Sequence, residues 1–190
     1  FEALTPDADQ PAEDPRQSAE VVPILDDADI ALERGPERVV DLHTVLDELV
    51  ADGILVQRQA EDLLIQPRTK KELTMHPLEV VAHHELTRQD DPHKHVDLDF
   101  LTARLAEQSG QPWKRIDPLE VNVNKCTDVM SCQFAQRHNI LAIDVSDDEV
   151  VIASAQPWKY QWEAILKQTL RGKVITRVVA NPEDLTRYTL

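Results

Sequence analysis

The 190-residue chain is acidic, and its composition argues against several classes of protein. Hydrophobic residues make up 42% of it, enough for the core of one ordinary domain or two small ones, so a wholly disordered chain is disfavoured. The formal net charge of −15 disfavours general binding to nucleic-acid phosphates. With four glycines, the chain has neither a phosphate-binding loop nor a dinucleotide-binding glycine motif. We therefore predict no enzyme and no nucleotide-driven motor in this chain.

Apolar runs are short, and cysteines are few. The longest runs have about five residues, whereas a membrane-spanning helix needs roughly 20. Cys126 and Cys132 lie six residues apart, match no zinc or redox motif and are expected to stay reduced. The sequence thus predicts a soluble protein of the cytoplasm without cofactors and without a membrane span.

Charge divides the chain into three parts. Residues 1–36 hold ten acidic and two basic residues, residues 37–108 hold fifteen and eight, and residues 109–190 hold ten and ten. The first part is rich in proline and small polar residues, so it buries too little apolar surface to offset its ordering entropy. We predict an acidic tail or linker there, in which the short apolar run at residues 21–25 could dock on a domain surface.

Residues 37–108 show the apolar spacing of amphipathic helices. Four helices are expected, at residues 39–50, 54–66, 77–82 and 98–109. Gly53, Pro67 and Gly110 are typical of the ends of such helices. Residues 46–54 align with residues 78–86, which predicts a degenerate repeat of two helical hairpins.

Residues 109–190 mix helices and strands. The expected elements are a helix capped by Thr127 or Asp128 and ending near His138, strands at 140–145 and 150–153, a helix over 158–170, a strand at 173–180 and a last helix beginning at Asn181-Pro182. Pro157 would open the 158–170 helix, and Trp158 and Trp162 would share one face of it, as core residues or as a partner-binding anchor. The predicted fold class is α+β, with the helical hairpin repeat followed by a small α/β sandwich that has a mixed sheet.

Five fragments of the chain follow a pattern known from one family. They are Gly110–Trp113, Ile116–Leu119, Phe134–Leu141, Val151–Ala153 and Val178–Leu185. With them, residues 98–190 resemble the N-terminal domain of the type II secretion and type IV pilus assembly ATPases, including the secretion-ATPase E subunit and MshE-like domains. Ala142 stands where the family has proline, and Gln156 where it has aspartate before Pro157.

The resemblance implies a non-catalytic adaptor or regulatory domain of a bacterial secretion, pilus or related envelope machine. Such a domain docks a protein partner, for example an inner-membrane-associated component, and lies in the cytoplasm at the inner-membrane face. From the residues, we predict a docking surface on a basic strip beside an apolar helix face, with solvation of a helix flank as the alternative. The strip consists of Lys159, Lys167, Arg171, Lys173 and Arg177.

The helical repeat resembles the version of this domain that binds cyclic di-GMP, which is the second hypothesis. Each repeat of that version begins with Arg-Leu-Gly and has a later glycine. The corresponding residues here are Thr44, Val45, Leu46 and Gly53 in the first copy, and His76, Pro77, Leu78 and Glu85 in the second. Arginine stacks on guanine or pairs with phosphate, and glycine allows close approach of a backbone. Because these residues are replaced, we predict little or no binding of cyclic di-GMP.

A third hypothesis is a metal-binding or catalytic protein. The candidate ligands are four histidines in or beside a polar loop rich in aspartate: His83, His84, His93 and His95. Imidazole and carboxylate groups bind transition metals. Their spacing matches no metal-binding motif, so a solvated loop is the alternative, and no nucleophile stands at a spacing that pairs it with a base.

Overall fold

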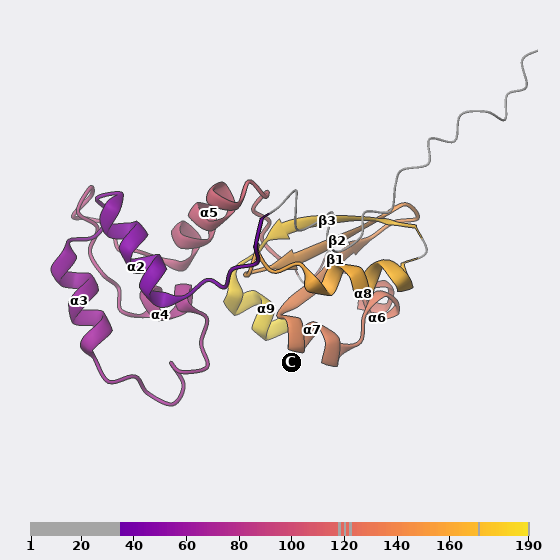
Figure 1. The fold of residues 1–190 in the computed structure, drawn as a ribbon, viewed down its shortest axis with the longest axis horizontal. Helices are drawn as coiled ribbons and strands as arrows, with labels where there is room; N and C mark the ends of the chain where they lie inside the picture. Colours follow the sequence, from indigo (N-terminus) through magenta and orange to yellow (C-terminus); the bar gives the residue numbers. More distant parts are fainter. Residues whose placement is uncertain (1–34, 118, 120, 122, 171, 190) are drawn as a thin grey trace, which may run out of the picture.

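The computed structural model describes residues 35–189 except 118, 120, 122 and 171. The predicted tail at residues 1–36, with its apolar run at residues 21–25, therefore lies almost entirely outside the described residues. A group of helices forms one end of the molecule, and a three-stranded sheet with its own helices forms the other (Figure 1). The α+β fold predicted from the sequence is confirmed.

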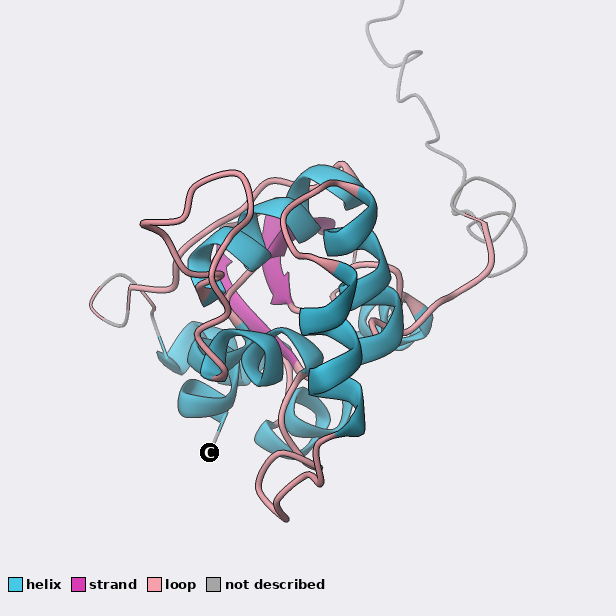
Figure 2. Ribbon diagram, turned by 90° about the vertical axis from the view of Figure 1, so that its left-hand side faces the viewer, coloured by secondary structure: helices cyan, strands magenta, loops and turns pink. Residues whose placement is uncertain are grey.

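Four helices form the helical part, as predicted. They are α2 (Leu42–Ala51), α3 (Gln57–Ile65), α4 (Pro77–His83) and α5 (Leu98–Ser109). Their apolar faces meet in one core that includes Leu46, Leu49, Val81 and Leu101. Gly110 ends α5 in the left-handed conformation. Seen from the helical end, these helices lie in front of the strands (Figure 2).

The two predicted hairpins have matching turns. Gly53 after α2 and Glu85 after α4 occupy aligned positions, and both have positive φ angles, of 69° and 45°. Their N–H groups donate to the carbonyl oxygens of Val50 and Ala82, which are also aligned. Residues with a side chain rarely adopt this conformation. The two turns therefore share one backbone conformation, with glycine in the first and glutamate in the second.

One predicted helix is wrong. The sequence predicted a helix from Thr127 or Asp128 to about His138, whereas the structure has α6 (Val123–Val129) and α7 (Cys132–His138). Ser131 separates them, because its side-chain oxygen accepts a hydrogen bond from the backbone N–H of Phe134 at 3.2 Å. Such a cap begins a new helix.

The sheet is mixed, as predicted. Strands β1 (Ile140–Val145) and β2 (Glu149–Ser154) are antiparallel, and β3 (Val174–Val179) runs parallel to β2 after a crossover through α8 (Gln161–Thr169). One face packs against α6, α7 and α8 through a core that includes Ala142, Val150 and Ile152. The other packs against α9 (Pro182–Thr189) through Ile143, Ala153 and Leu185.

Helix α8 begins later than predicted. It starts at Gln161, so neither Pro157 nor Trp158 belongs to it. Arg177 donates to the carbonyl oxygens of Pro157 and Lys159, which withdraws them from helical hydrogen bonding. Trp162 is buried in the core, as predicted, but Trp158 packs against the helical part, so the two tryptophans share no helix face.

The helical part and the sheet meet along β3. Val179 packs in the core of the helical part, and Trp113, after α5, forms a parallel bridge with it. The division into units at residues 37–108 and 109–190 stays a prediction. Within the described ranges, no helix has the length and apolarity needed to cross a membrane.

Candidate functional site

In the first predicted repeat copy, Thr44 and Leu46, at two of the expected ligand-motif positions, form helix-end and core contacts. Thr44 lies at the start of α2, where its hydroxyl donates to Asp41 at 2.6 Å and its N–H donates to the same carboxylate at 3.0 Å. These two hydrogen bonds lower the pKa of Asp41. Leu46 is fully buried in the core. Gly53 has open space where a side chain would be, so its positive φ angle, rather than a close neighbour, favours glycine there.

In the second copy, two of the motif positions, His76 and Leu78, are buried. His76 caps α4, with its Nδ1 accepting from the N–H of Leu78 at 3.3 Å and its Nε2 lying 2.9 Å from Nε2 of Gln156. Burial lowers the pKa of His76 from 6.5 to about 4, so the ring is neutral at pH 7. Leu78 belongs to the core. Neither His76 nor Leu78 offers a charged group to a ligand.

A small cavity lies between α2 and α5, beside Thr44. Its volume is about 140 Å³, whereas sites for drug-sized ligands have roughly 300–1,000 Å³. Two arginines line it, and both have partners: Arg38 stacks over Trp158, 3.4 Å from the ring centroid, and Arg104 pairs with Asp52. The cavity is thus smaller than a dinucleotide. Both arginines that line it already interact with other side chains of the protein.

The four candidate metal ligands do not form a site. His84 lies 3.4 Å from a carboxylate oxygen of Glu72, while His83, His93 and His95 are exposed. Among the residues that the structure describes, no three histidine, cysteine, aspartate or glutamate side chains come together as a metal site would require. The geometry gives the metal hypothesis no support.

Only part of the predicted basic strip lies on the surface. Lys159, Lys167 and Lys173 are all partly exposed, and the Nζ of Lys173 donates to the carbonyl of Ser146. Arg171 lies outside the described residues. Arg177 requires a correction, because its side chain is 7% exposed and turns inward. It cannot contribute to an exposed strip.

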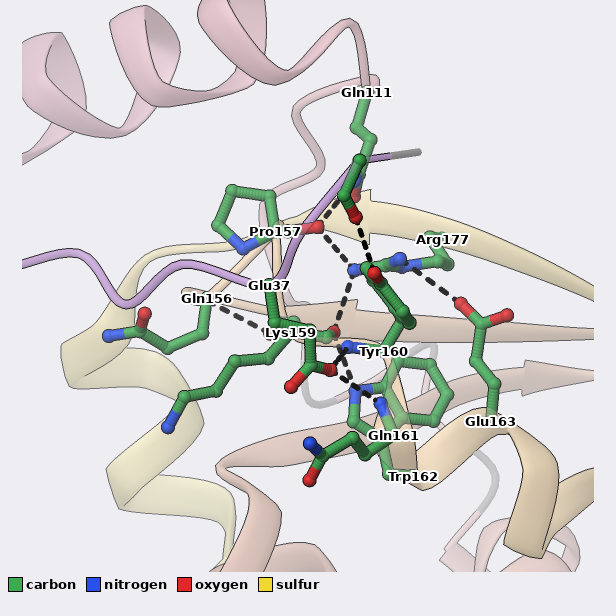
Figure 3. A network of polar contacts seen from close by, with 12 residues as sticks. Glu37, Gln111, Gln156, Pro157, Lys159, Tyr160, Gln161, Trp162, Glu163 and Arg177 are labelled. Carbon is green, nitrogen blue, oxygen red and sulfur yellow. Dashed lines mark hydrogen bonds and ion pairs between the residues drawn. The ribbon is translucent and has the colours of Figure 1, made fainter. Parts of the chain in front are cut away.

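Arg177 instead forms a buried ion pair under α8. Its Nη1 lies 3.1 Å from Oε1 of Glu163, whose side chain is 2% exposed (Figure 3). The other terminal nitrogen holds the loop before α8 through the carbonyls of Pro157 and Lys159. Gln111 also donates to the carbonyl of Pro157, at 2.9 Å. The β3 arginine thereby fixes the position at which α8 begins.

Residues 35–40, here called the clasp, bind the same loop from the N-terminal side. Glu37 accepts hydrogen bonds from the N–H groups of Tyr160 and Gln161, at 2.6 and 2.8 Å, at the start of α8 (Figure 3). Tyr160 donates its hydroxyl proton to the carbonyl of Gly35, and Val40 donates its N–H to the side chain of Gln156 at 2.8 Å. The clasp caps α8 from more than 100 positions away in sequence.

Sequence reasoning missed Glu37 and Gln111, and it noted Gln156 only as a departure from a family pattern. No local signal marks Glu37, because its partners are 123 and 124 positions away. Gln156 did carry a signal. An uncharged amide at a position expected to hold aspartate is suited to a buried site that must both accept and donate hydrogen bonds.

The fold and these contacts define an α+β module in which a group of four helices joins a mixed three-stranded sheet. Residues 109–189 match the model of the MshEN domain family. The relationship to the N-terminal domains of type II secretion and type IV pilus ATPases, predicted from the sequence, is confirmed.

The chain is similar to three known proteins or structures. The type IV pilus assembly ATPase TfpB of Acinetobacter baylyi is 39% identical over 151 residues, which are 78% of this chain but 26% of TfpB. The solved structure of MshE with cdg has a TM-score of 0.51 at 19% identity, covering 79% of this chain and 96% of that one. The N-terminal domain of XpsE covers 80% and 96%, at 13% identity and a TM-score of 0.42.

Proposed function

We propose that this chain is a non-catalytic docking module of a pilus or secretion ATPase and acts in the cytoplasm at the inner-membrane face. The match to the MshEN domain family and the similarity to TfpB support this proposal. The module would hold an inner-membrane-associated protein of the machine near the motor. ATP hydrolysis would belong to a separate catalytic domain.

The outer face of α8 is the proposed docking surface. Ile165 carries the proposal, because it is 50% exposed on a helix whose other large apolar residues, Trp162 and Leu166, are buried. Lys159 and Lys167 lie near it along the chain and add positive charge. An apolar anchor with charges at its rim is typical of protein–protein interfaces, in which the charges steer association.

The double variant Ile165→Asp/Lys167→Glu is expected to weaken binding to the inner-membrane partner at least about tenfold, since removing an interface anchor costs about 2 kcal/mol. Biolayer interferometry against the purified inner-membrane components of the machine measures this change. Arg58→Glu is the matched control, because the side chain of Arg58 is 89% exposed on α3, in the helical part. Equal weakening by both variants, or by neither, would place the interface elsewhere. Circular dichroism confirms that each variant is folded.

Sensing of cyclic di-GMP is the alternative function. The likeness to MshE with cdg favours this alternative, and it extends over the helical repeat, since it covers 79% of the chain. The aligned turns at Gly53 and Glu85 add a shared backbone conformation. Two observations argue against binding of cyclic di-GMP. His76 and Leu46, at motif positions, are buried, and the cavity beside Thr44 is small.

We predict that cyclic di-GMP binds weakly or not at all. Each lost charged hydrogen bond costs about 1.5–3 kcal/mol, so two missing arginine contacts weaken binding by a factor on the order of 100 or more. Titration calorimetry on this chain, with MshE as the positive control, measures the affinity. A submicromolar dissociation constant would mean that residues other than Thr44 and His76 supply the contacts.

A further inference from the structure

Strand β3 lies at an edge of the sheet. On one side it pairs with β2, to which Val174 and Ala180 point their N–H groups. On its other side, Val179 donates to the carbonyl of Pro112 and accepts from the N–H of Lys114, both at 2.9 Å. Alternate residues of a strand direct their backbone groups to the same edge, so Ile175 faces the same side as Val179. Among the described residues, Ile175 has no backbone hydrogen-bond partner on that side.

A cavity of about 320 Å³ adjoins this edge. Ile175, Arg177, Gln111 and Tyr160 contribute to its lining. The amide nitrogen of Gln111 donates to Pro157, but its buried oxygen Oε1 has no hydrogen-bond partner among the described residues. A buried acceptor without a donor costs about 1–3 kcal/mol. The cavity thus calls for a hydrogen-bond donor, and the strand edge for a backbone segment that offers both N–H and carbonyl groups.

The first residue of the clasp lies next to this cavity. Tyr160, which lines the cavity, donates its hydroxyl proton to the carbonyl of Gly35, so Gly35 lies beside the cavity. Five extended residues span about 16 Å, enough to run along β3 from the level of Arg177 toward its first residue. The segment Ile30-Ala31-Leu32-Glu33-Arg34 has branched apolar residues at alternate positions, a spacing that suits an edge strand.

We propose that the open edge of β3 is a strand-addition site and that residues 30–34 of this chain occupy it. The segment runs parallel to β3, pairs with Ile175 and supplies the N–H donor that Oε1 of Gln111 lacks. An occupied edge no longer offers unpaired backbone groups to a second copy or to a peptide of a partner. Any partner that pairs with β3 must first displace this segment, which makes the edge a regulated binding site.

Two truncated chains test the proposal, one beginning at residue 30 and one beginning at Gly35. Residue-resolved amide hydrogen exchange is measured at Ile175, with Ile152 of the central strand as the reference. We expect the amide of Ile175 to exchange at least tenfold faster in the chain that begins at Gly35, while that of Ile152 is unchanged. Equal exchange of Ile175 in the two chains would overturn the proposal.

A full-length pair of variants gives an independent comparison that retains the whole chain. Ile30→Pro/Leu32→Pro removes backbone donors within the proposed strand, and Val22→Pro/Ile24→Pro makes the same change outside it. Faster exchange of Ile175 only in the first variant supports strand addition. Identical exchange in both variants contradicts it and leaves the edge to a separate partner. If the chain beginning at Gly35 also loses protection at Ile152, the truncation has destabilised the whole sheet. The two full-length variants then provide the test of strand addition.

Discussion

Replacing Arg177 with methionine is expected to destabilise the folded chain by about 3–5 kcal/mol, because the change removes the guanidinium group that lies 3.1 Å from the buried carboxylate of Glu163. The side chains of the pair are 7% and 2% exposed, so water cannot replace the lost partner. The variant also frees the carbonyls of Pro157 and Lys159, which hold the loop before α8. Urea unfolding followed by circular dichroism measures the change.

Two controls separate the buried pair from charge effects in general. Arg187→Met removes a 59% exposed arginine that pairs with Glu183, and is expected to cost less than about 1 kcal/mol. Arg177→Met/Glu163→Leu removes both charges and should recover much of the stability, since no unpaired buried charge remains. A loss below about 1 kcal/mol for Arg177→Met alone would show that Glu163 is compensated by other groups.

The second large effect is a loss of folding stability at acidic pH, caused by His76. Because the pKa of His76 is about 4 in the folded chain and about 6.5 in the unfolded one, the unfolded chain takes up a proton first as the pH falls. Folding stability that is present above pH 6.5 is therefore lost progressively down to about pH 4. Between these two pKa values, the loss of folding free energy amounts to about 3 kcal/mol.

His76→Asn isolates this contribution, since asparagine can still cap α4 but does not titrate. Other groups with shifted pKa values, such as Glu79 and His138, titrate in both proteins and cancel in the comparison. We expect the unfolding free energy of the wild type, minus that of the variant, to fall by about 3 kcal/mol between pH 7 and pH 4. A difference that stays constant with pH would mean that the ring of His76 is accessible to water.

Local sequence patterns predicted most of the fold. The amphipathic spacing of α2 to α5 and the alternation of β1 and β2 are properties of neighbouring residues, and each element was found where its pattern stands. The errors fell where a distant or capping contact overrides the local pattern. Ser131 divides a predicted helix, and Arg177 delays the start of α8.

The candidate sites were less predictable than the elements. Sequence alone identified the degenerate motif positions, including Thr44 and His76, because a motif is a matter of residue type and spacing. It could not show that His76 is buried against Gln156, a partner 80 positions away. The sequence also could not show which side chains are exposed. It predicted one basic strip of five residues, whereas in the folded chain Arg177 is buried and pairs with Glu163.

The sequence by itself predicted the fold class, most of the elements in their order and the family relationship, since each depends on residue type at a local or repeated spacing. Only the tertiary structure decided which side chains reach solvent and which backbone edges stay open. The clasp at Glu37, the buried pair of Arg177 and Glu163, and the edge at Ile175 all depend on contacts between segments far apart in the chain. Such contacts form because burial leaves each charge and each amide requiring a partner, and local patterns do not specify which one.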